Sequence, residues 1–262
     1  MSRSVDVVII GSGNVAEAFA RAVSGTEGLY LRQIFARNSE RGEYLACECG
    51  TKWCGEAEEL AEADLYIIAI SDRAVESVAR SLRFRSGAMV VHTAGSVPLA
   101  ALPEQGVRRG IFYAFQSFTA GRRVEFNGLP LFVEAESEAD YAMLESFGRM
   151  LGCRVERADS ERRKRIHLAG VFVNNFVNHL YGVARGVVEG VGLDFEVLKP
   201  LIRETAMKAL DVDNPALVQT GPAVRGDRAV CERHLVMLQD DEIKQQIYKY
   251  ITESIWETSK KI

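Results

Sequence analysis

The sequence predicts an α/β fold, with a doubly wound and mostly parallel sheet, followed by an all-α C-terminal domain. Up to about residue 155, short apolar runs rich in β-branched residues alternate with helical patterns, as in a parallel sheet covered on both faces. After Ala158 the strand pattern disappears and only helical patterns remain. The 262 residues suffice for one large or two modest domains. We therefore place the first domain at 1–158 and the second at 159–262.

The expected elements follow from apolar periodicity. The strands are Val5–Ile10, Leu29–Ala36, Leu65–Ile70, Ala88–His92, Gly110–Phe115, Leu131–Ala135 and Arg154–Glu156. The clearest late helix of the first domain is Ser137–Leu151, and the helices of the second are Ser160–Glu189, Asp194–Leu210, Asp227–Gln239 and Asp241–Trp256.

The start of the chain carries the most specific motif. The apolar strand Val5–Ile10 runs directly into a Gly-x-Gly-x-x-Ala turn, and a helical pattern follows. This order of strand, glycine turn and helix is typical of a Rossmann-type unit that binds a dinucleotide pyrophosphate. The residues of the turn expected to contact the cofactor are Gly11, Ser12, Gly13, Asn14 and Val15. An ordinary strand–turn–helix unit without a ligand is the alternative.

The end of the second strand indicates which dinucleotide is bound. An NAD-binding unit usually has Asp or Glu there to bond the ribose hydroxyl. This chain has Arg37 and Asn38 instead. A guanidinium and an amide suit a 2′-phosphate, so the sequence predicts NADP as the cofactor. The alternative for Arg37 is a solvated surface side chain.

Composition excludes several classes of protein. The formal net charge is −4, and no long basic run suggests nucleic-acid binding. The short cluster Arg162-Arg163-Lys164-Arg165 is interpreted as a solvated face or an anion-facing patch. No apolar stretch approaches the length of a membrane span, and no signal peptide is recognised. We therefore expect a cytoplasmic protein with no membrane partner.

The five cysteines are expected to be reduced thiols. Cys47, Cys49 and Cys54 are close in sequence, but no histidine or fourth cysteine lies nearby to complete a tetrahedral site. We therefore expect no metal site.

Polar residues follow three of the predicted strands, at the carboxyl edge where open α/β sheets bind ligands. Ser71 and Asp72 follow the strand Leu65–Ile70. They are candidates for the N-cap of a helix over Arg73–Leu82, and the same loop would lie along the cofactor.

The strand Ala88–His92 leads into small hydroxylated residues, including Thr93 and Ser96. We expect this segment beside the nicotinamide ring. His92 is a catalytic candidate, or else a core histidine bonded to backbone. Gln116, after the strand Gly110–Phe115, is a candidate for the wall of a substrate pocket. The alternative is that this loop satisfies the hydrogen bonds of its own backbone.

The helix around residues 166–181 is apolar nearly all round, so it is expected to be buried. His167, Asn174 and Asn178 lie on one stripe of it. Buried polar groups need partners, so this stripe predicts a polar pocket. Bonds to neighbouring helix ends or to a second subunit are the alternative.

The loop Thr220–Asp227 holds a Gly-Pro pair, and Asp227 can cap the next helix. Arg225 in this loop can clamp an anionic substrate, or the loop is a structural hinge. His234 follows shortly afterwards, with no role assigned from the sequence.

Together, the glycine turn and the segments His92–Ser96, Gln116–Phe118, His167–Asn175 and Thr220–Asp227 resemble one family. Its members are proposed NADP oxidoreductases with a Rossmann-like domain and an uncharacterised helical C-terminal domain. The resemblance covers nearly the whole chain. The wider group is similar to pyrroline carboxylate reductases, ketopantoate reductases and β-hydroxyacid dehydrogenases.

The chain departs from these relatives at two places. The family usually has a His-Pro pair where this chain has Tyr113-Ala114. The β-hydroxyacid dehydrogenases carry a catalytic lysine one helical turn before an asparagine. The corresponding positions before Asn174 and Asn175 are Gly170 and Val171, which cannot donate a proton.

The leading interpretation is an NADPH-dependent reductase of a small carbonyl or imine, which binds its substrate in the cleft between the two domains. His167 would be the acid, Asn174 an orienting donor, and Ser96 and Gln116 substrate contacts. The alternative is an NADP(H)-binding sensor without turnover, which the absent lysine favours. The apolar C-terminal helices also predict a homodimer.

Overall fold

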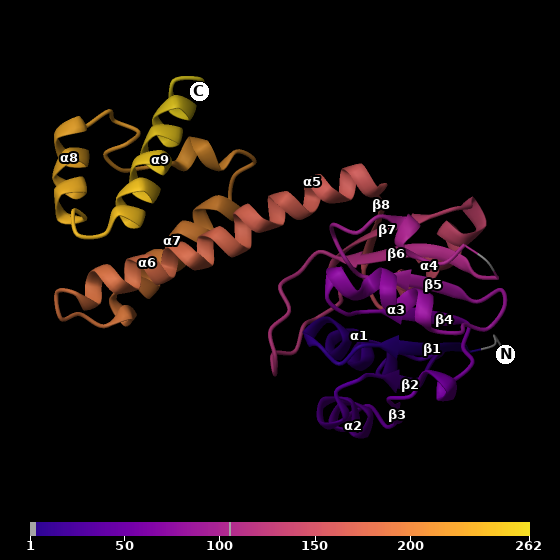
Figure 1. Cartoon of the computed structure of the whole chain (residues 1–262). Coiled ribbons are helices and arrows are strands. Elements are labelled where there is room, and N and C mark those ends of the chain that lie inside the picture. Colours follow the sequence, from indigo (N-terminus) through magenta and orange to yellow (C-terminus); the bar gives the residue numbers. More distant parts are fainter. Residues whose placement is uncertain (1–3, 105) are drawn as a thin grey trace. The chain divides into compact units, whose positions relative to one another are not determined.

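Residues 4–104 and 106–262 are described by a computed structural model, in which the first part of the chain forms one eight-stranded sheet (Figure 1). The strands are β1 (Val5–Ile10), β2 (Leu29–Phe35), β3 (Lys52–Cys54), β4 (Leu65–Ile68), β5 (Met89–His92), β6 (Arg108–Ala114), β7 (Pro130–Ala135) and β8 (Arg154–Arg157). Their order in the sheet is β3-β2-β1-β4-β5-β6-β7-β8, and only β6 and β7 pair antiparallel. The predicted α/β class, with a mostly parallel sheet, is confirmed.

The helices of this part are α1 (Asn14–Ser24), α2 (Ser39–Glu48), α3 (Val75–Ser81) and α4 (Glu138–Met150). The helical region that follows contains α5 (Ser160–Gly170), a π-helical turn (Val171–Phe176), α6 (Val177–Glu189), α7 (Lys199–Leu210), α8 (Arg228–Met237) and α9 (Glu242–Ser259). Short 3₁₀ turns occur at Ala57–Glu59, Asp72–Ala74, Leu99–Ala101, Phe195–Leu198 and Pro215–Val218.

Aspartates begin three of the C-terminal helices. The carboxylate of Asp159 accepts the N–H of Arg162 at 2.7 Å at the start of α5. Asp227 and Asp241 cap α8 and α9 in the same way. An aspartate at this position satisfies a backbone donor that has no partner inside the helix. The cap predicted for Asp227 is confirmed.

The chain divides into two compact units, Met1–Asn175 and Phe176–Ile262. Strands give way to helices at Ala158, as expected, but α5 belongs to the first unit. The domain boundary at 158/159 stays a prediction.

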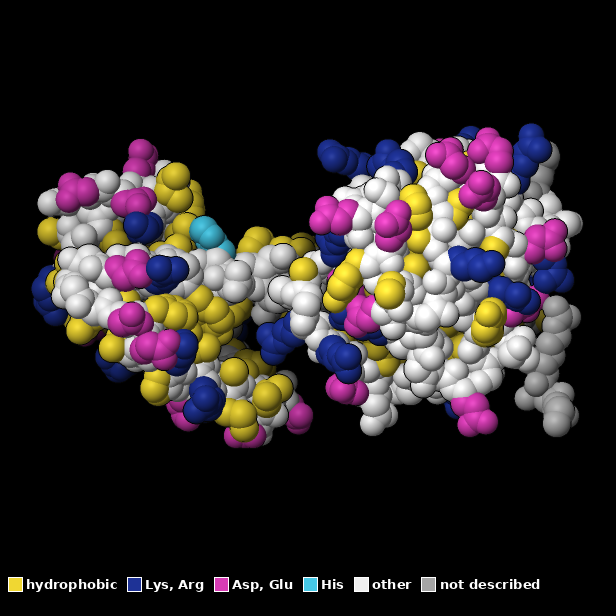
Figure 2. Space-filling model, turned by 90° about the horizontal axis from the view of Figure 1, so that it is seen from below, with side chains coloured by type: hydrophobic (Ala, Val, Ile, Leu, Met, Phe, Trp, Pro, Cys, Tyr) yellow, Lys and Arg dark blue, Asp and Glu magenta, His cyan; other side chains and the backbone are white. Residues whose placement is uncertain are grey.

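The second unit exposes much of its apolar surface. Residues 176–262 are all described, and none of them is buried in the single chain. Figure 2 shows hydrophobic side chains gathered over the helical unit on the face in view. Leu168, Phe172 and Val173 in the helix that leads into this unit are also exposed, at 55%, 60% and 69%, rather than buried as expected. In the single chain, these helices therefore leave many apolar side chains exposed to solvent.

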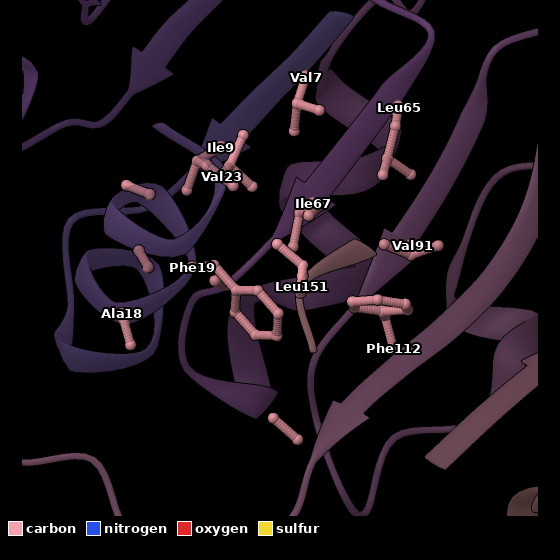
Figure 3. Close-up of a cluster of buried hydrophobic side chains, with 14 of the residues drawn as sticks. Val7, Ile9, Ala18, Phe19, Val23, Leu65, Ile67, Val91, Phe112 and Leu151 are labelled. Atoms are coloured by element: carbon pink, nitrogen blue, oxygen red, sulfur yellow. The ribbon is translucent and has the colours of Figure 1, made fainter. Parts of the chain in front are cut away.

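The sheet buries both of its faces. Val7 and Ile9 of β1 point to one face, where they pack with Phe19 of α1 and with side chains from α2 and α4. Figure 3 shows Phe19 directed into this cluster, which also contains Phe112 of β6. Val8 and Ile10 point to the other face, toward α3. Because successive strand residues alternate between faces and both faces are covered, the buried part of β1, Val7–Ile10, is apolar at every position.

Among the described residues, no helix combines the length and the apolar character that a membrane span requires.

Candidate functional site

The turn between β1 and α1 is shaped by two glycines. Gly11 has φ +130°, and a Cβ there would lie 2.3 Å from the carbonyl oxygen of Ala69, so no other residue fits. A Cβ on Gly13 would meet nothing within 4 Å. The space before the N-terminus of α1 is therefore open, and backbone N–H groups and the positive end of the helix dipole face it.

A cavity of about 1250 Å³ extends from this turn along the carboxyl ends of β1, β2 and β4. The predicted cofactor residues that line it are Gly11, Ser12, Gly13, Asn14, Val15, Arg37, Asn38 and Ser71. Asp72 and Thr93, which were also predicted to bind the cofactor, do not line this cavity. An open helix N-terminus, a close backbone turn and a cation at the far rim fit a dinucleotide with a 2′-phosphate.

Two of the polar candidates line the far rim of this cavity, which is the part formed by the residues after β2. Arg37 is exposed directly after β2. The side-chain oxygen of Asn38 accepts the N–H of Arg41 at 2.9 Å and so caps α2, which leaves the amide nitrogen for a ligand. Arg41 also approaches Glu17 at 3.6 Å. Arg37 is therefore the guanidinium most accessible to a phosphate at this rim.

The loop after β4 differs from the helix cap expected there. A 3₁₀ turn over Asp72–Ala74 precedes α3, and the side chain of Ser71 makes no capping bond. The carboxylate of Asp72 instead accepts the hydroxyl of Ser96 at 2.5 Å. The contact joins the loops that follow β4 and β5.

His92 is fully buried and organises the loop after β5. Its Nδ1 accepts the N–H of Ala94 at 3.2 Å, and its Nε2 lies 3.4 Å from the carbonyl oxygen of Pro98. Burial, and then the charge of Arg163, lower the pKa of His92 to about 4, so the ring is neutral at neutral pH. His92 is therefore a core histidine bonded to backbone, which was the alternative to a catalytic role in the sequence analysis. Thr93 is turned toward the backbone of β4, with its hydroxyl 3.4 Å from the carbonyl oxygen of Ile68.

Arg163 was expected on a solvated or anion-facing patch, and this expectation is wrong, because its side chain is 0% exposed. From α5 it donates to the carboxylate of Glu134 on β7 and to the carbonyl oxygen of Val97 at 2.5 Å. Ser160 donates to the same carboxylate at 2.9 Å. Arg163 therefore ties α5 to the sheet and to the loop after β5 at once.

One turn further along α5, His167 meets a residue that the sequence did not suggest as a site residue. The hydroxyl of Tyr113, on β6, lies 3.1 Å from Nδ1 of His167. Burial, and then the charge of Asp72, raise the pKa of Tyr113 to about 12. The sequence signals for Tyr113 were its place near the carboxyl end of a predicted strand and the departure of Tyr113-Ala114 from the His-Pro pair that the resemblance led us to expect.

The Tyr113–His167 pair lines a second, smaller cavity of about 190 Å³. Gln116 and Asn174 line the same cavity, so three of the four predicted substrate-contact or acid residues converge. Ser96 is held by Asp72 instead. The side-chain oxygen of Gln116 also accepts the N–H of Ser117 at 2.8 Å, so Gln116 makes a hydrogen bond within its own loop as well.

Two glycines let α5 approach this cavity. A Cβ on Gly95 would lie 2.6 Å from Nδ1 of His167, and a Cβ on Gly170 would lie 2.8 Å from the Phe115 ring. Phe115 thus occupies the space that a side chain at position 170 would need. Asn174 lies in the π-helical turn, a distortion that is common at functional sites.

The second unit gives a structural role to His234, for which the sequence suggested none. Nδ1 of His234 lies 2.7 Å from the hydroxyl of Tyr248 and so joins α8 to α9. Gly226, with φ +65°, packs its backbone against the ring of Trp256. Arg225, beside it, is exposed.

All five cysteines are free thiols. Within residues 4–104 and 106–262, no group of three or more His, Cys, Asp or Glu side chains is placed to hold a metal ion.

Two sequence families match the chain. Residues 6–95 match the family described as NADP oxidoreductase coenzyme F420-dependent, and residues 129–255 match a domain of unknown function, DUF2520. No curated protein matches the sequence.

Solved structures extend the likeness over the whole chain. A proposed NADP oxidoreductase from Bacteroides fragilis is 36% identical, with a TM-score of 0.87, and the match covers 97% of this chain and 98% of that one. A 1-pyrroline-5-carboxylate reductase from Streptococcus pyogenes shares the fold at 13% identity, with a TM-score of 0.64 and 100% of both chains covered. A reductive aminase from Aspergillus terreus, in complex with NADPH and ethyl levulinate, is also 13% identical, with a TM-score of 0.68 and 98% and 94% covered.

The match to the Bacteroides fragilis protein, which covers nearly the whole chain, is consistent with the glycine turn and with the cavity beside it. The chain belongs to the family of NADP oxidoreductases that combine a Rossmann-like domain with a helical DUF2520 domain.

Proposed function

We propose that this NADP-dependent oxidoreductase reduces a small carbonyl or imine compound in the cavity of Tyr113, Gln116, His167 and Asn174. The observation that carries the proposal is the convergence of a histidine, an asparagine and a glutamine on one small cavity at the carboxyl edge of the sheet. The distant structural neighbours, which include a reductive aminase, favour the imine class. A substrate position between two domains stays a prediction.

The residues have distinct tasks in this proposal. NADPH, when bound, supplies a hydride to the substrate carbon. His167 donates a proton to the substrate oxygen or nitrogen, which completes reduction to an alcohol or an amine. Asn174 donates a hydrogen bond that orients the substrate, and Gln116 contacts it from the end of β6. Ser96 and His92 act by holding the neighbouring loop.

The test is turnover with a panel of substrates. The protein is incubated with NADPH and keto acids, cyclic imines or aldehydes, and the loss of NADPH absorbance is followed. We expect turnover with at least one class. NADPH binding by calorimetry without turnover of any class would instead support an NADP(H) sensor.

Gly13→Val is expected to abolish cofactor binding without harming the fold. A Cβ at this position meets no protein atom within 4 Å, but it projects into the space proposed for the pyrophosphate. NADPH affinity should fall by about 100-fold or more, while the melting temperature stays near that of the native protein. Gly11→Ala is the contrasting variant, because its Cβ strikes backbone and its φ is strained, so it should lower the melting temperature. Unchanged NADPH affinity in Gly13→Val would place the pyrophosphate elsewhere.

Arg37→Asp is expected to weaken NADP binding more than NAD binding, by about 1–3 kcal/mol, because one charge-assisted contact to the 2′-phosphate is lost. The control is Arg154→Asp, which makes the same charge change at an exposed position on β8. Calorimetric titration of both cofactors gives the difference. Equal affinities of the native protein for NADP and NAD would refute the preference.

A cytoplasmic homodimer completes the proposal. The second unit buries none of its residues within the chain, and its exposed apolar side chains include Leu201, Leu210 and Met237 at 63%, 78% and 77%. A second copy of the chain would cover these helices. Sedimentation at micromolar concentration is expected to give the dimer mass, and Leu201→Asp with Leu210→Asp should shift it to the monomer. A monomeric native protein would overturn this part.

A further inference from the structure

The hydroxyl of Tyr113, on β6, lies 3.1 Å from Nδ1 of His167, on α5. We propose that Tyr113 is a positioning residue that fixes the tautomer of His167 in the resting protein, so that Nε2 carries the proton offered to a ligand in the cavity. The inference rests on the proposed function, in which His167 is the acid.

The hydrogen bond works in both protonation states of the ring. When the ring is neutral, Nδ1 is a good acceptor and the phenol is a better donor than acceptor. We therefore expect the phenol O–H to donate to Nδ1, which places the ring proton on Nε2. When the ring is charged, Nδ1–H donates to the phenol oxygen, and Nε2 again carries a proton. A phenylalanine at 113 would leave both tautomers of the neutral ring accessible.

Tyr113 suits this role because it remains a phenol at neutral pH. Its pKa is raised to about 12 by burial and by the carboxylate of Asp72. The O–H is therefore available to donate.

The packing holds the pair in place. The Tyr113 and His167 rings meet at a centroid distance of 6.0 Å and an angle of 64°. Phe115 and Phe132 pack on the other sides of the Tyr113 ring, at 6.2 and 6.4 Å. The bare Cα of Gly95 borders both Nδ1 and the phenol, because a Cβ there would lie 2.6 Å from Nδ1 and 2.9 Å from Cζ of Tyr113.

Two charged groups act on Tyr113 in opposite directions. The charge of Asp72, in the loop after β4, raises the pKa of the phenol, and the charge of Arg163, on the preceding turn of α5, lowers it. Arg163 is itself paired with Glu134 of β7, and His92 of β5 is neutral at neutral pH.

The proton step follows from this arrangement. As the substrate carbon accepts the hydride, the electron pair of its double bond moves to oxygen or nitrogen. That atom takes the proton from Nε2 of the charged ring, so the Nε2–H bond breaks and a new O–H or N–H bond forms. The ring is left neutral for a moment, with Nδ1–H bonded to the phenol oxygen, until water returns a proton to Nε2. When the charged ring next loses a proton to solvent it loses the one on Nδ1, so the resting neutral ring is again the Nε2–H tautomer.

The first test does not need turnover. The full chain is labelled with ¹⁵N-histidine, and the ring nitrogens are observed by NMR without cofactor across a pH titration. Only four histidines are present, and the signals of His167 are those lost in His167→Gln. We expect the neutral ring to be the Nε2–H tautomer in the native protein and in Tyr30→Phe, a matched control at an exposed position. In Tyr113→Phe it should become a mixture. An Nδ1–H tautomer in the native protein, or no change in Tyr113→Phe, would overturn the inference.

The second test uses a substrate found by the panel. Tyr113→Phe should lower kcat by about 10- to 100-fold, the worth of one charge-assisted hydrogen bond, with KM and NADPH affinity changed by about twofold or less. In a His167→Gln background, Tyr113→Phe should have no further effect. Additive losses, or a rise in KM alone, would contradict a role through His167. If the native protein turns over no substrate, the proposed function fails, and the NMR result still decides the tautomer.

Discussion

Replacing Arg163 with methionine is expected to lower the free energy of unfolding of the first unit by about 3–5 kcal/mol. Arg163 is completely buried, and its partner Glu134 is only 18% exposed. The variant would leave that carboxylate without its counter-charge, and the carbonyl oxygen of Val97 without its donor. An uncompensated buried charge costs far more than the loss of an exposed ion pair.

The two tryptophans allow this loss to be assigned to the first unit. Trp53 lies in β3 and Trp256 in α9, so a Trp256→Phe background leaves Trp53 as the reporter during urea unfolding. Arg162→Met is the matched control, because its side chain is 60% exposed on the same helix turn. A combined Arg163→Met and Glu134→Leu variant should recover part of the loss, since it removes both charges. An unfolding midpoint for Arg163→Met equal to that of Arg162→Met would contradict the buried anchor.

His167→Ala is expected to cut the rate of hydride transfer by about 10²- to 10⁴-fold while NADPH affinity stays nearly intact. The reason is that His167 borders the small cavity, whereas the cavity fitted to the cofactor is lined by other residues. The acid would be removed without disturbing the glycine turn. The measurement is a single-turnover rate with a substrate identified by the panel.

The structural alternative for His167 makes the opposite prediction. If the ring only packs, the variant should melt at lower temperature and its folded fraction should react at the native rate. His179→Ala, at an exposed position on α6, is the control for loss of a histidine. A stable, NADPH-binding His167→Ala variant with full activity would show that His167 is not the proton donor.

The sequence by itself determined the secondary structure and the cofactor class. Seven of the eight strands overlap their predicted positions, and Val5–Ile10 matches residue for residue. The long helical segment over Ser160–Glu189 is also as predicted. Apolar periodicity and the glycine turn are local properties, because each depends on residues a few positions apart. The strand over Lys52–Cys54 was missed because its three residues carry no such pattern, and pairing with β2 creates it.

The tertiary structure decided which polar residues of the candidate site act together. Arg163 sits in a basic cluster that looks solvated, yet its partners Glu134 and Val97 lie 29 and 66 residues away and bury it. Tyr113 and His167 are separated by 54 residues and meet only because α5 crosses the end of β6. No local pattern encodes such contacts. They arise when packing of the sheet and helix removes water and leaves each buried donor or acceptor to bond with whatever polar group the fold has brought within reach.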